Sequence, residues 1–219
     1  MATIASAPQA NDLKKALAPF FNPPRNPVLV DVPELGYLMI DGTGAPDEAP
    51  AGEGAEYPTT DFQKAFAAFF PVAYTIKFRL KADGLPMPIL PLEALWFTNP
   101  DGTFDANVPP AQWGWRAMIG VAHEVTPAIF DDAVAEVRRK KGNSDALDRL
   151  RFERWREGRC AQVMHVGPYA EEMPTLERLA RFIADEGLRP RGSHHEIYLG
   201  DPRRADPAKL RTVLRQPVE

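Results

Sequence analysis

The chain has 219 residues, of which 44% are hydrophobic and 26% are charged, so it can form one or two globular domains. A formal net charge of −4 argues against nucleic acid as the main partner, because phosphate contacts need a basic surface. The single cysteine, Cys160, excludes an internal disulfide and fits a reducing compartment. We find neither a signal peptide nor an apolar run of the roughly 18 residues that a membrane helix needs, and therefore expect a cytoplasmic protein.

Residues 1–27 are expected to form an N-terminal arm, in which four prolines limit any helix to about 12–20. Two strands are predicted next, at 28–32 and 37–40, with a break at 33–36. A loop rich in Gly, Pro and acidic residues should then extend over 41–58.

The next elements complete a first structural unit. Phe62, Phe66 and Phe69 recur at helical spacing, which predicts an amphipathic helix over 61–81. Strands are predicted at 92–97 and 113–122. The first unit, about 28–122, thus has the order strand, helix, strand, strand.

A helical connector is predicted over 127–157. Thr126-Pro127 is a typical helix start, since proline is favoured at the first helical position. Gly142-Asn143 should break the connector, and Ser144 can cap a second helix that we expect to continue through Trp155.

The remaining residues repeat the order of the first unit. A strand is predicted at 159–166, a helix at 174–186, and strands at 194–199 and 210–217. The second unit therefore covers about 159–218, and residues 28–219 form one domain built from two βαββ repeats. We expect an α+β fold in which the repeats form one antiparallel sheet, with helices on one face and a groove on the other.

One short strand carries the strongest candidate for function. Strand side chains alternate between faces, so Glu196 and Tyr198 share the face opposite Ile197. Aligning the two repeats places Trp96 opposite Tyr198 and Ala94 opposite Glu196. An alternative interpretation is that Glu196 lies on a solvated face and pairs with an arginine.

Tryptophans on the predicted strands suggest an aromatic groove. Trp113 and Trp115 share one strand face, and Trp96 lies on the neighbouring strand. Aromatic side chains bind flat, apolar or cationic molecules. Packing in the core is the alternative for each tryptophan taken singly.

Several kinds of catalytic site lack their sequence pattern. His194 and His195 point to opposite strand faces, and no Cys/His/Asp set has zinc-ligand spacing. No phosphate-binding loop or Gly-x-Ser-x-Gly motif occurs, and Cys160 has no evident base. We therefore expect no metal, no cofactor and no covalent nucleophile.

The order of these motifs resembles the GyrI-like small-molecule-binding superfamily, in the branch whose members stand alone. The resemblance is carried by the segments 73–77, 91–97, 113–115, 162–169, 194–202 and 210–218. It implies the same pair of βαββ units around a groove for amphipathic molecules. In the effector-binding domains of multidrug-responsive activators, the position of Glu196 carries an acidic residue deep in the pocket. We expect no room in this chain for their helix-turn-helix DNA-binding domain, which argues against the regulator function.

The resemblance also implies candidate functions. Some stand-alone members are cyclopropanoid cyclopropane hydrolases, which open the reactive ring of DNA-alkylating compounds. In such an enzyme Glu196 would activate water and Tyr198 or Tyr169 would donate a hydrogen bond. Ligand-binding candidates are Tyr74, Trp96, Trp113, Trp115, Met164 and His165.

Two alternatives remain open: a binder that sequesters a toxin or drug without chemistry, with Glu196 as counter-charge, or a protein-interaction module of the gyrase-inhibitor type. In each case we expect a small-molecule ligand as the main partner, no nucleic acid or membrane, and a monomer or weak homodimer.

Overall fold

The computed structural model describes residues 2–3, 9–10, 12–46, 60–105 and 107–219, so positions 47–58 of the expected loop lie outside it. Its strands are β1 (Ala2–Thr3), β2 (Val28–Thr43), β3 (Leu92–Phe97), β4 (Gly114–Val121), β5 (Arg151–Val166), β6 (His194–Tyr198) and β7 (Arg211–Pro217). Its α-helices are α1 (Leu13–Ala16), α2 (Ala18–Phe21), α3 (Asp61–Ala82), α4 (Pro127–Lys141), α5 (Asp145–Arg149) and α6 (Met173–Asp185). Single 3-10 turns are η1 (Pro110–Gln112), η2 (Tyr169–Glu171) and η3 (Pro207–Lys209).

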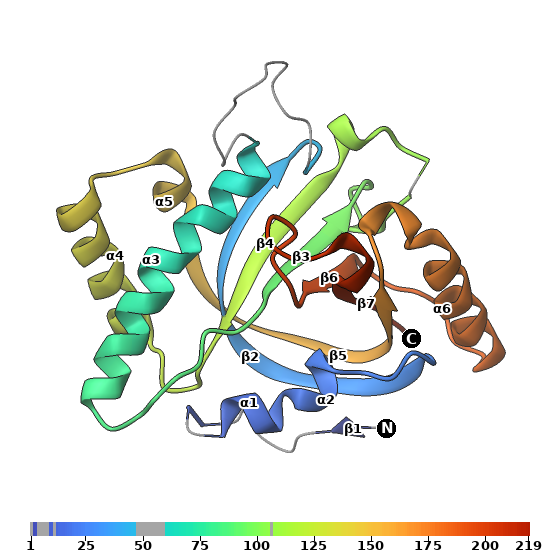
Figure 1. Cartoon of the computed structure of the whole chain (residues 1–219), viewed down its shortest axis with the longest axis horizontal. Coiled ribbons are helices and arrows are strands. Elements are labelled where there is room, and N and C mark those ends of the chain that lie inside the picture. Colours follow the sequence, from blue (N-terminus) through green and yellow to red (C-terminus); the bar gives the residue numbers. More distant parts are fainter. Residues whose placement is uncertain (1, 4–8, 11, 47–59, 106) are drawn as a thin grey trace.

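Six strands close into an antiparallel barrel in the order β2-β4-β3-β6-β7-β5 (Figure 1). Closure comes from β2 and β5, two 16-residue strands that pair from Val28 opposite Gln162 to Met39 opposite Arg151. Gly158 lies opposite Val32 with φ of 78°, a conformation that favours glycine, and it allows this long strand pair to bend. The antiparallel sheet expected from the sequence is therefore closed into a barrel.

Two predicted boundaries were wrong, both on the closing strands. β2 is continuous through the expected break at 33–36, because Val32 and Glu34 keep their pairing on either side of Pro33. Residues 151–157 form strand instead of helix: α5 ends at Arg149, and β5 begins at Arg151. Pairing with β2 therefore outweighs local helix preference over this stretch.

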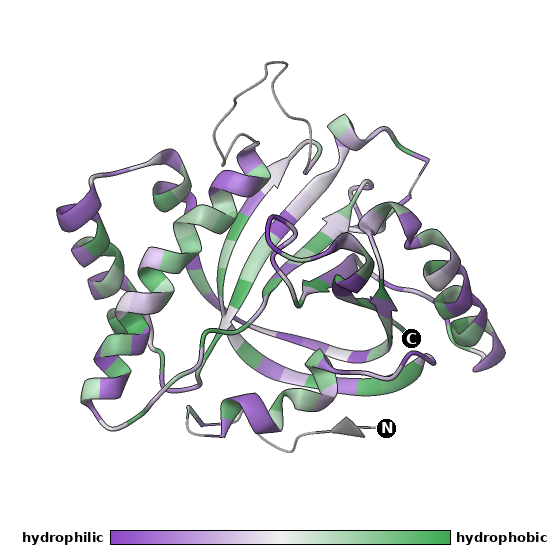
Figure 2. Ribbon diagram, viewed as in Figure 1, coloured by the Kyte–Doolittle hydropathy of each residue, from purple (hydrophilic) through white to green (hydrophobic). Residues whose placement is uncertain are grey.

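Helices α3, α4 and α6 lie against the outer face of the barrel (Figure 1). Thr60 caps the N-terminus of α3, because its hydroxyl accepts the Gln63 backbone N–H. The helix buries the periodic side chains Phe62, Phe66 and Phe69. α4 packs along α3, whereas α6 packs its Leu179 against β5. Figure 2 shows hydrophobic and hydrophilic residues alternating along β2 and β5, as expected for strands with two different faces. None of the helices among the described residues is long and apolar enough to span a bilayer.

A network of charged side chains is buried on the inner face of the barrel. Glu157 accepts hydrogen bonds from His195 Nδ1 and Arg215 Nη1, both at 2.9 Å, and His195 Nε2 lies 3.0 Å from a Glu93 carboxylate oxygen. Burial alone would raise the pKa of Glu157, but the charges of His195 and Arg215 outweigh it and hold this pKa at about 2. All four residues are at most 2% exposed.

The N-terminal helices cover this charged network. The backbone carbonyl of Phe20, in α2, accepts a hydrogen bond from Arg215, and the carbonyl of Pro19 accepts one from Gln162. The face without α3 and α6 is therefore closed, and the expectation of a groove there was wrong.

Candidate functional site

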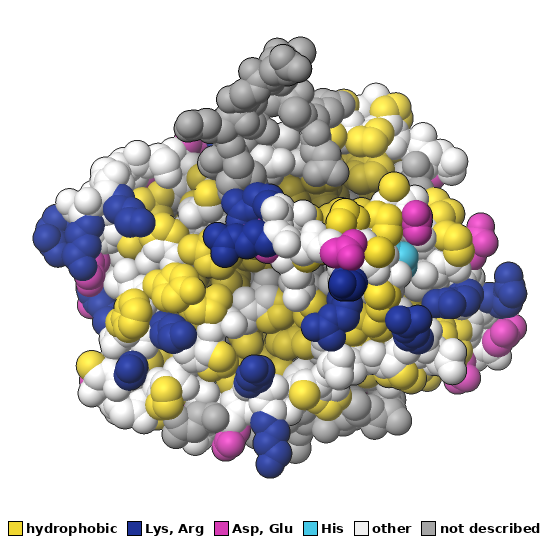
Figure 3. Space-filling view, viewed as in Figure 1, with side chains coloured by type: hydrophobic (Ala, Val, Ile, Leu, Met, Phe, Trp, Pro, Cys, Tyr) yellow, Lys and Arg dark blue, Asp and Glu magenta, His cyan; other side chains and the backbone are white. Residues whose placement is uncertain are grey.

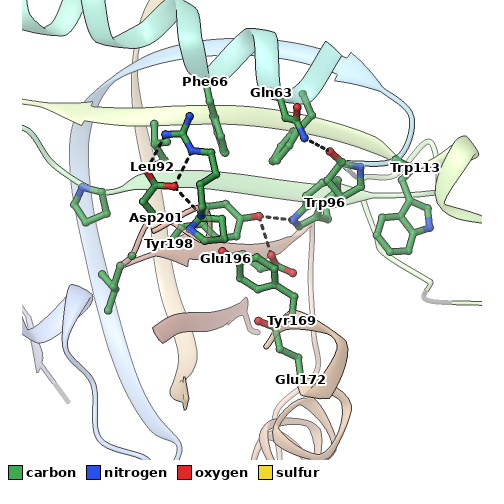
Figure 4. A pocket seen from close by; sticks show the side chains of 18 of the residues that line it. Gln63, Phe66, Leu92, Trp96, Trp113, Tyr169, Glu172, Glu196, Tyr198 and Asp201 are labelled. Carbon is green, nitrogen blue, oxygen red and sulfur yellow. Dashed lines mark hydrogen bonds and ion pairs between the residues drawn. The ribbon is translucent and has the colours of Figure 1, made fainter. Parts of the chain in front are cut away.

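A pocket of about 960 Å³ opens on the outer face, between α3, the β3–β6 strand pair and the turn that precedes α6 (Figure 4). Figure 3 shows hydrophobic side chains gathered in a central hollow of the same face. The helix side is lined by Phe62, Gln63, Phe66 and Phe70, and the opposite side by Leu92, Trp96, Trp113, Tyr169, Glu172, Glu196 and Tyr198. The helices thus form a wall of the groove.

The register of β3 and β6 decides which side chains meet on the pocket floor. Ala94 lies opposite Glu196, as the aligned repeats suggested. The other expected pair was wrong: because the strands are antiparallel, Trp96 lies opposite His194, and Leu92 lies opposite Tyr198. Trp96 nevertheless reaches Tyr198 diagonally across the pair.

A hydrogen-bonded chain of three side chains crosses this floor (Figure 4). Trp96 Nε1 donates to the Tyr198 hydroxyl oxygen at 3.3 Å, and that hydroxyl donates to Glu196 Oε2 at 2.8 Å. Burial, followed by the charge of Glu196 and this hydrogen bond, raises the pKa of Tyr198 well above its ordinary value. Tyr198 therefore stays protonated and orients Glu196.

The carboxylate of Glu196 lies in the pocket. Its side chain is 18% exposed, and its Oε1 is 3.6 Å from His194 Nε2. No arginine forms an ion pair with Glu196 within the part of the chain that the structure describes, in contrast to the solvated alternative considered above. One carboxylate oxygen is thus held by Tyr198, while the other lies toward His194.

Aromatic rings surround the hydrogen-bonded side chains Trp96, Tyr198 and Glu196 on several sides. Phe62 stacks at a tilt 4.9 Å from Trp96, and Phe66 meets Tyr198 edge to face at 5.9 Å. Tyr169, from η2, approaches the same Tyr198 ring at 5.8 Å. Such an arrangement can bury a flat ligand and leave one acidic end for a polar or cationic group.

Glu172 is a second acid in the pocket that the sequence interpretation missed. It is the N-cap residue of α6, yet its side chain makes no capping hydrogen bond. It is 7% exposed, and its Oε1 has no hydrogen-bond partner. Burial, followed by the negative charge of Glu196, raises the pKa of Glu172 to about 9. Pro174 marks the helix start in the sequence, but no local pattern shows which way this carboxyl points.

Four residues expected in the site lie elsewhere. Trp115 is fully buried behind Phe62, 5.3 Å from it, and supports the wall without lining the pocket. Tyr74 is 44% exposed farther along α3. Met164 faces the inner side of the barrel, where it packs with Ile197 and Val213. His165 is buried beside the site, hydrogen-bonded to Thr175 at 3.1 Å. Trp96, Trp113, Tyr169, Glu196 and Tyr198 do line the pocket.

The connection from β6 to β7 borders the pocket mouth through Leu199, Gly200, Asp201, Pro202 and Arg203. Asp201 holds Arg203 through two side-chain hydrogen bonds of 2.8 Å each. Among the described residues, no group of three His, Cys, Asp or Glu side chains is arranged to hold a metal ion.

Solved structures resemble the chain over almost its whole length. A structure described as a hydrolase from Listeria innocua is 36% identical, with a TM-score of 0.77, and the match covers 94% of this chain and 98% of that one. An uncharacterized conserved protein from Listeria innocua matches with the same identity and coverage, at a TM-score of 0.81. The EcmrR C-terminal domain, 15% identical with a TM-score of 0.52, covers 89% of this chain and 97% of its own, and shares the fold.

Among proteins with curated descriptions, none matches the chain. The family of GyrI-like small molecule binding domains matches residues 25–219, which include every strand of the barrel and every side chain of the pocket. The chain therefore belongs to the GyrI-like small-molecule-binding domain family.

Proposed function

We propose that the pocket binds flat aromatic or cationic molecules and hydrolyses those that carry a reactive electrophilic carbon, such as the strained cyclopropane of a DNA-alkylating compound. The observation that carries the proposal is the pair of hydrogen bonds that links Trp96 to Tyr198 and Tyr198 to Glu196, in a pocket lined by aromatic rings. The 36% identity to structures described as hydrolases supports chemistry in addition to binding.

In this proposal Glu196 is the general base. Its Oε2 accepts the Tyr198 hydroxyl, so Oε1 is the oxygen that can hold a water. The water attacks a ring carbon and a C–O bond forms as Glu196 takes one proton of the water. The strained C–C bond breaks, and its electron pair passes to the acceptor group conjugated with the ring, which is then protonated. Positioned acid–base help of this kind contributes about 10²–10⁴-fold in rate.

The two tyrosines have different roles in this proposal. The Tyr198 proton is already directed at Glu196, so Tyr198 is a positioning residue. Tyr169 lines the pocket beside it and is placed to contact the ligand. Phe62 and Trp96 enclose the flat part of the molecule and exclude bulk water from the reacting carbon.

The test is turnover of a cyclopropane-containing alkylator by Glu196→Gln. We expect the rate to fall about 10²-fold or more, while binding of a neutral aromatic ligand is retained. Glu171→Gln, a change at an exposed carboxyl in the neighbouring turn, should keep the full rate. Unchanged turnover in Glu196→Gln would rule out this role for Glu196.

A second candidate is binding without chemistry, which the small-molecule-binding character of the family favours. Glu196 would then be the counter-charge of a cationic ligand. In that case Glu196→Gln weakens cationic ligands and spares neutral ones. Recovery of intact ligand after incubation with the wild-type protein would support this candidate, whereas a hydrolysed product would exclude it.

A further inference from the structure

We propose that Glu172 is the acid partner of Glu196: a neutral carboxyl that donates a hydrogen bond to a ligand oxygen and, during hydrolysis, transfers its proton to that oxygen. This inference rests on the proposed function and deepens it, because it names the second reacting group of the same pocket. It also narrows the substrate class to molecules with a conjugated carbonyl, or a similar acceptor, linked to the electrophilic carbon.

The position of Glu172 is the first support. Its side chain lines the pocket from the start of α6, on the side where Tyr169 lies, and Figure 4 places it close to Glu196. It is more than nine-tenths buried, and its Oε1 has no hydrogen-bond partner. A buried carboxyl oxygen without a partner is costly, so a native structure retains one mainly where a ligand completes its hydrogen bonds.

The charges around Glu172 favour its protonated form. No Lys, Arg or His forms an ion pair with it among the described residues, and Glu196 faces it across the pocket. Two acids that share a poorly hydrated site cannot both ionise easily. Thr212 of β7 is the other polar side chain that acts on Glu172. Tyr198 of β6, Tyr169 of η2 and the Asp201–Arg203 pair line the same pocket, and His165 of β5 is hydrogen-bonded to Thr175 of α6.

The two carboxyls differ in their partners, and this difference sets their roles. Glu196 Oε2 accepts a hydrogen bond from the Tyr198 hydroxyl, so Glu196 is held as an acceptor. Burial, followed by the charge of Glu196, raises the pKa of Glu172 to about 9, although a hydrogen bond from the Thr212 side chain acts in the opposite direction. In the proposed reaction Glu196 therefore acts as the base and Glu172 as the acid.

With these two roles, the proton transfers of the reaction balance. Water adds to the ring carbon, and Glu196 takes its proton. The electron pair of the broken C–C bond moves through the conjugated system to the carbonyl oxygen, which receives the proton of Glu172. The product is the ring-opened substrate with one water molecule added. Glu196 then releases its proton to solvent, and Glu172 takes up a proton from solvent.

The first experiment compares pH–rate profiles of Glu172→Gln and the wild type on a cyclopropane-containing alkylator with a conjugated carbonyl. The wild-type rate should fall as pH rises through about 9, where Glu172 loses its proton. In Glu172→Gln we expect kcat to fall about 10²-fold with a smaller change in KM, and the alkaline limb to disappear. Glu171→Gln should keep both the wild-type rate and the fall in rate above about pH 9. A full rate with an unchanged alkaline limb in Glu172→Gln overturns the inference.

The second experiment needs no turnover. Infrared difference spectra between neutral pH and a pH above 9 should show a protonated carboxyl band that disappears as pH rises. The band should be missing in Glu172→Gln and present in Glu171→Gln. If the wild type shows the band but no turnover, the proposed hydrolysis is contradicted, whereas the protonated state of Glu172 is supported. Turnover without the band would overturn the role of Glu172 alone.

Discussion

Replacing Glu157 by glutamine removes the central negative charge of the network inside the barrel. The two carboxylate oxygens accept hydrogen bonds from His195 and Arg215, each at 2.9 Å, and the side chain is 1% exposed. Glutamine has one acceptor oxygen, and its NH₂ group would face one of these two donors. The substitution therefore leaves the buried Arg215 without its counter-charge.

The pKa of Glu157 gives the size of the effect. The ordinary value is 4.5 and the folded value is about 2, a difference of about 2.5 units. At ~1.36 kcal/mol per unit, ionised Glu157 contributes about 3 kcal/mol at neutral pH. Breaking a buried ion pair typically costs a similar ~3–5 kcal/mol. Because the folded pKa is lowered, this stability is present above the unfolded value of 4.5 and is lost as pH falls toward 2.

Urea unfolding of the wild type and Glu157→Gln, measured at neutral pH and at several lower values, tests this estimate. We expect a deficit of about 3 kcal/mol at neutral pH that shrinks as pH falls below 5. Glu153→Gln is the matched control: it lies on the same strand, pairs with Arg151 and is 43% exposed, so it should cost under ~1 kcal/mol. Equal deficits for the two variants, or a deficit independent of pH, would refute the reasoning.

Two further substitutions test the placement of the pocket. In Gly42→Ala the new Cβ would lie 2.2 Å from the buried ring of Trp115, which supports Phe62; we expect a lower Tm and weaker ligand binding, measured by thermal unfolding and ligand titration. Met164→Leu changes a side chain on the inner face and should cost under ~1.5 kcal/mol without altering ligand affinity; a large affinity change would contradict the orientation of Met164.

The parts of the fold that follow from local patterns could be predicted from the sequence. The spacing of Phe62, Phe66 and Phe69 predicted α3, because the helical period alone brings these side chains to one face. Alternation along 194–199 likewise placed Glu196 and Tyr198 on one face, and both line the pocket. The order strand, helix, strand, strand in each half is also that of the structure.

Only the tertiary structure decided which faces are open and which are filled. Val28 pairs with Gln162, far along the chain, and no local signal shows that β2 and β5 close a barrel or that residues 151–157 belong to it. Closure buries the network around Glu157 on one side of the sheet and leaves the pocket under α3 on the other. A period of two says that neighbouring side chains face opposite ways, but whether a face meets a helix, a cavity or another strand depends on distant residues. For the same reason the direction of Glu172, at a helix start, came only from the packing of α6 against the barrel.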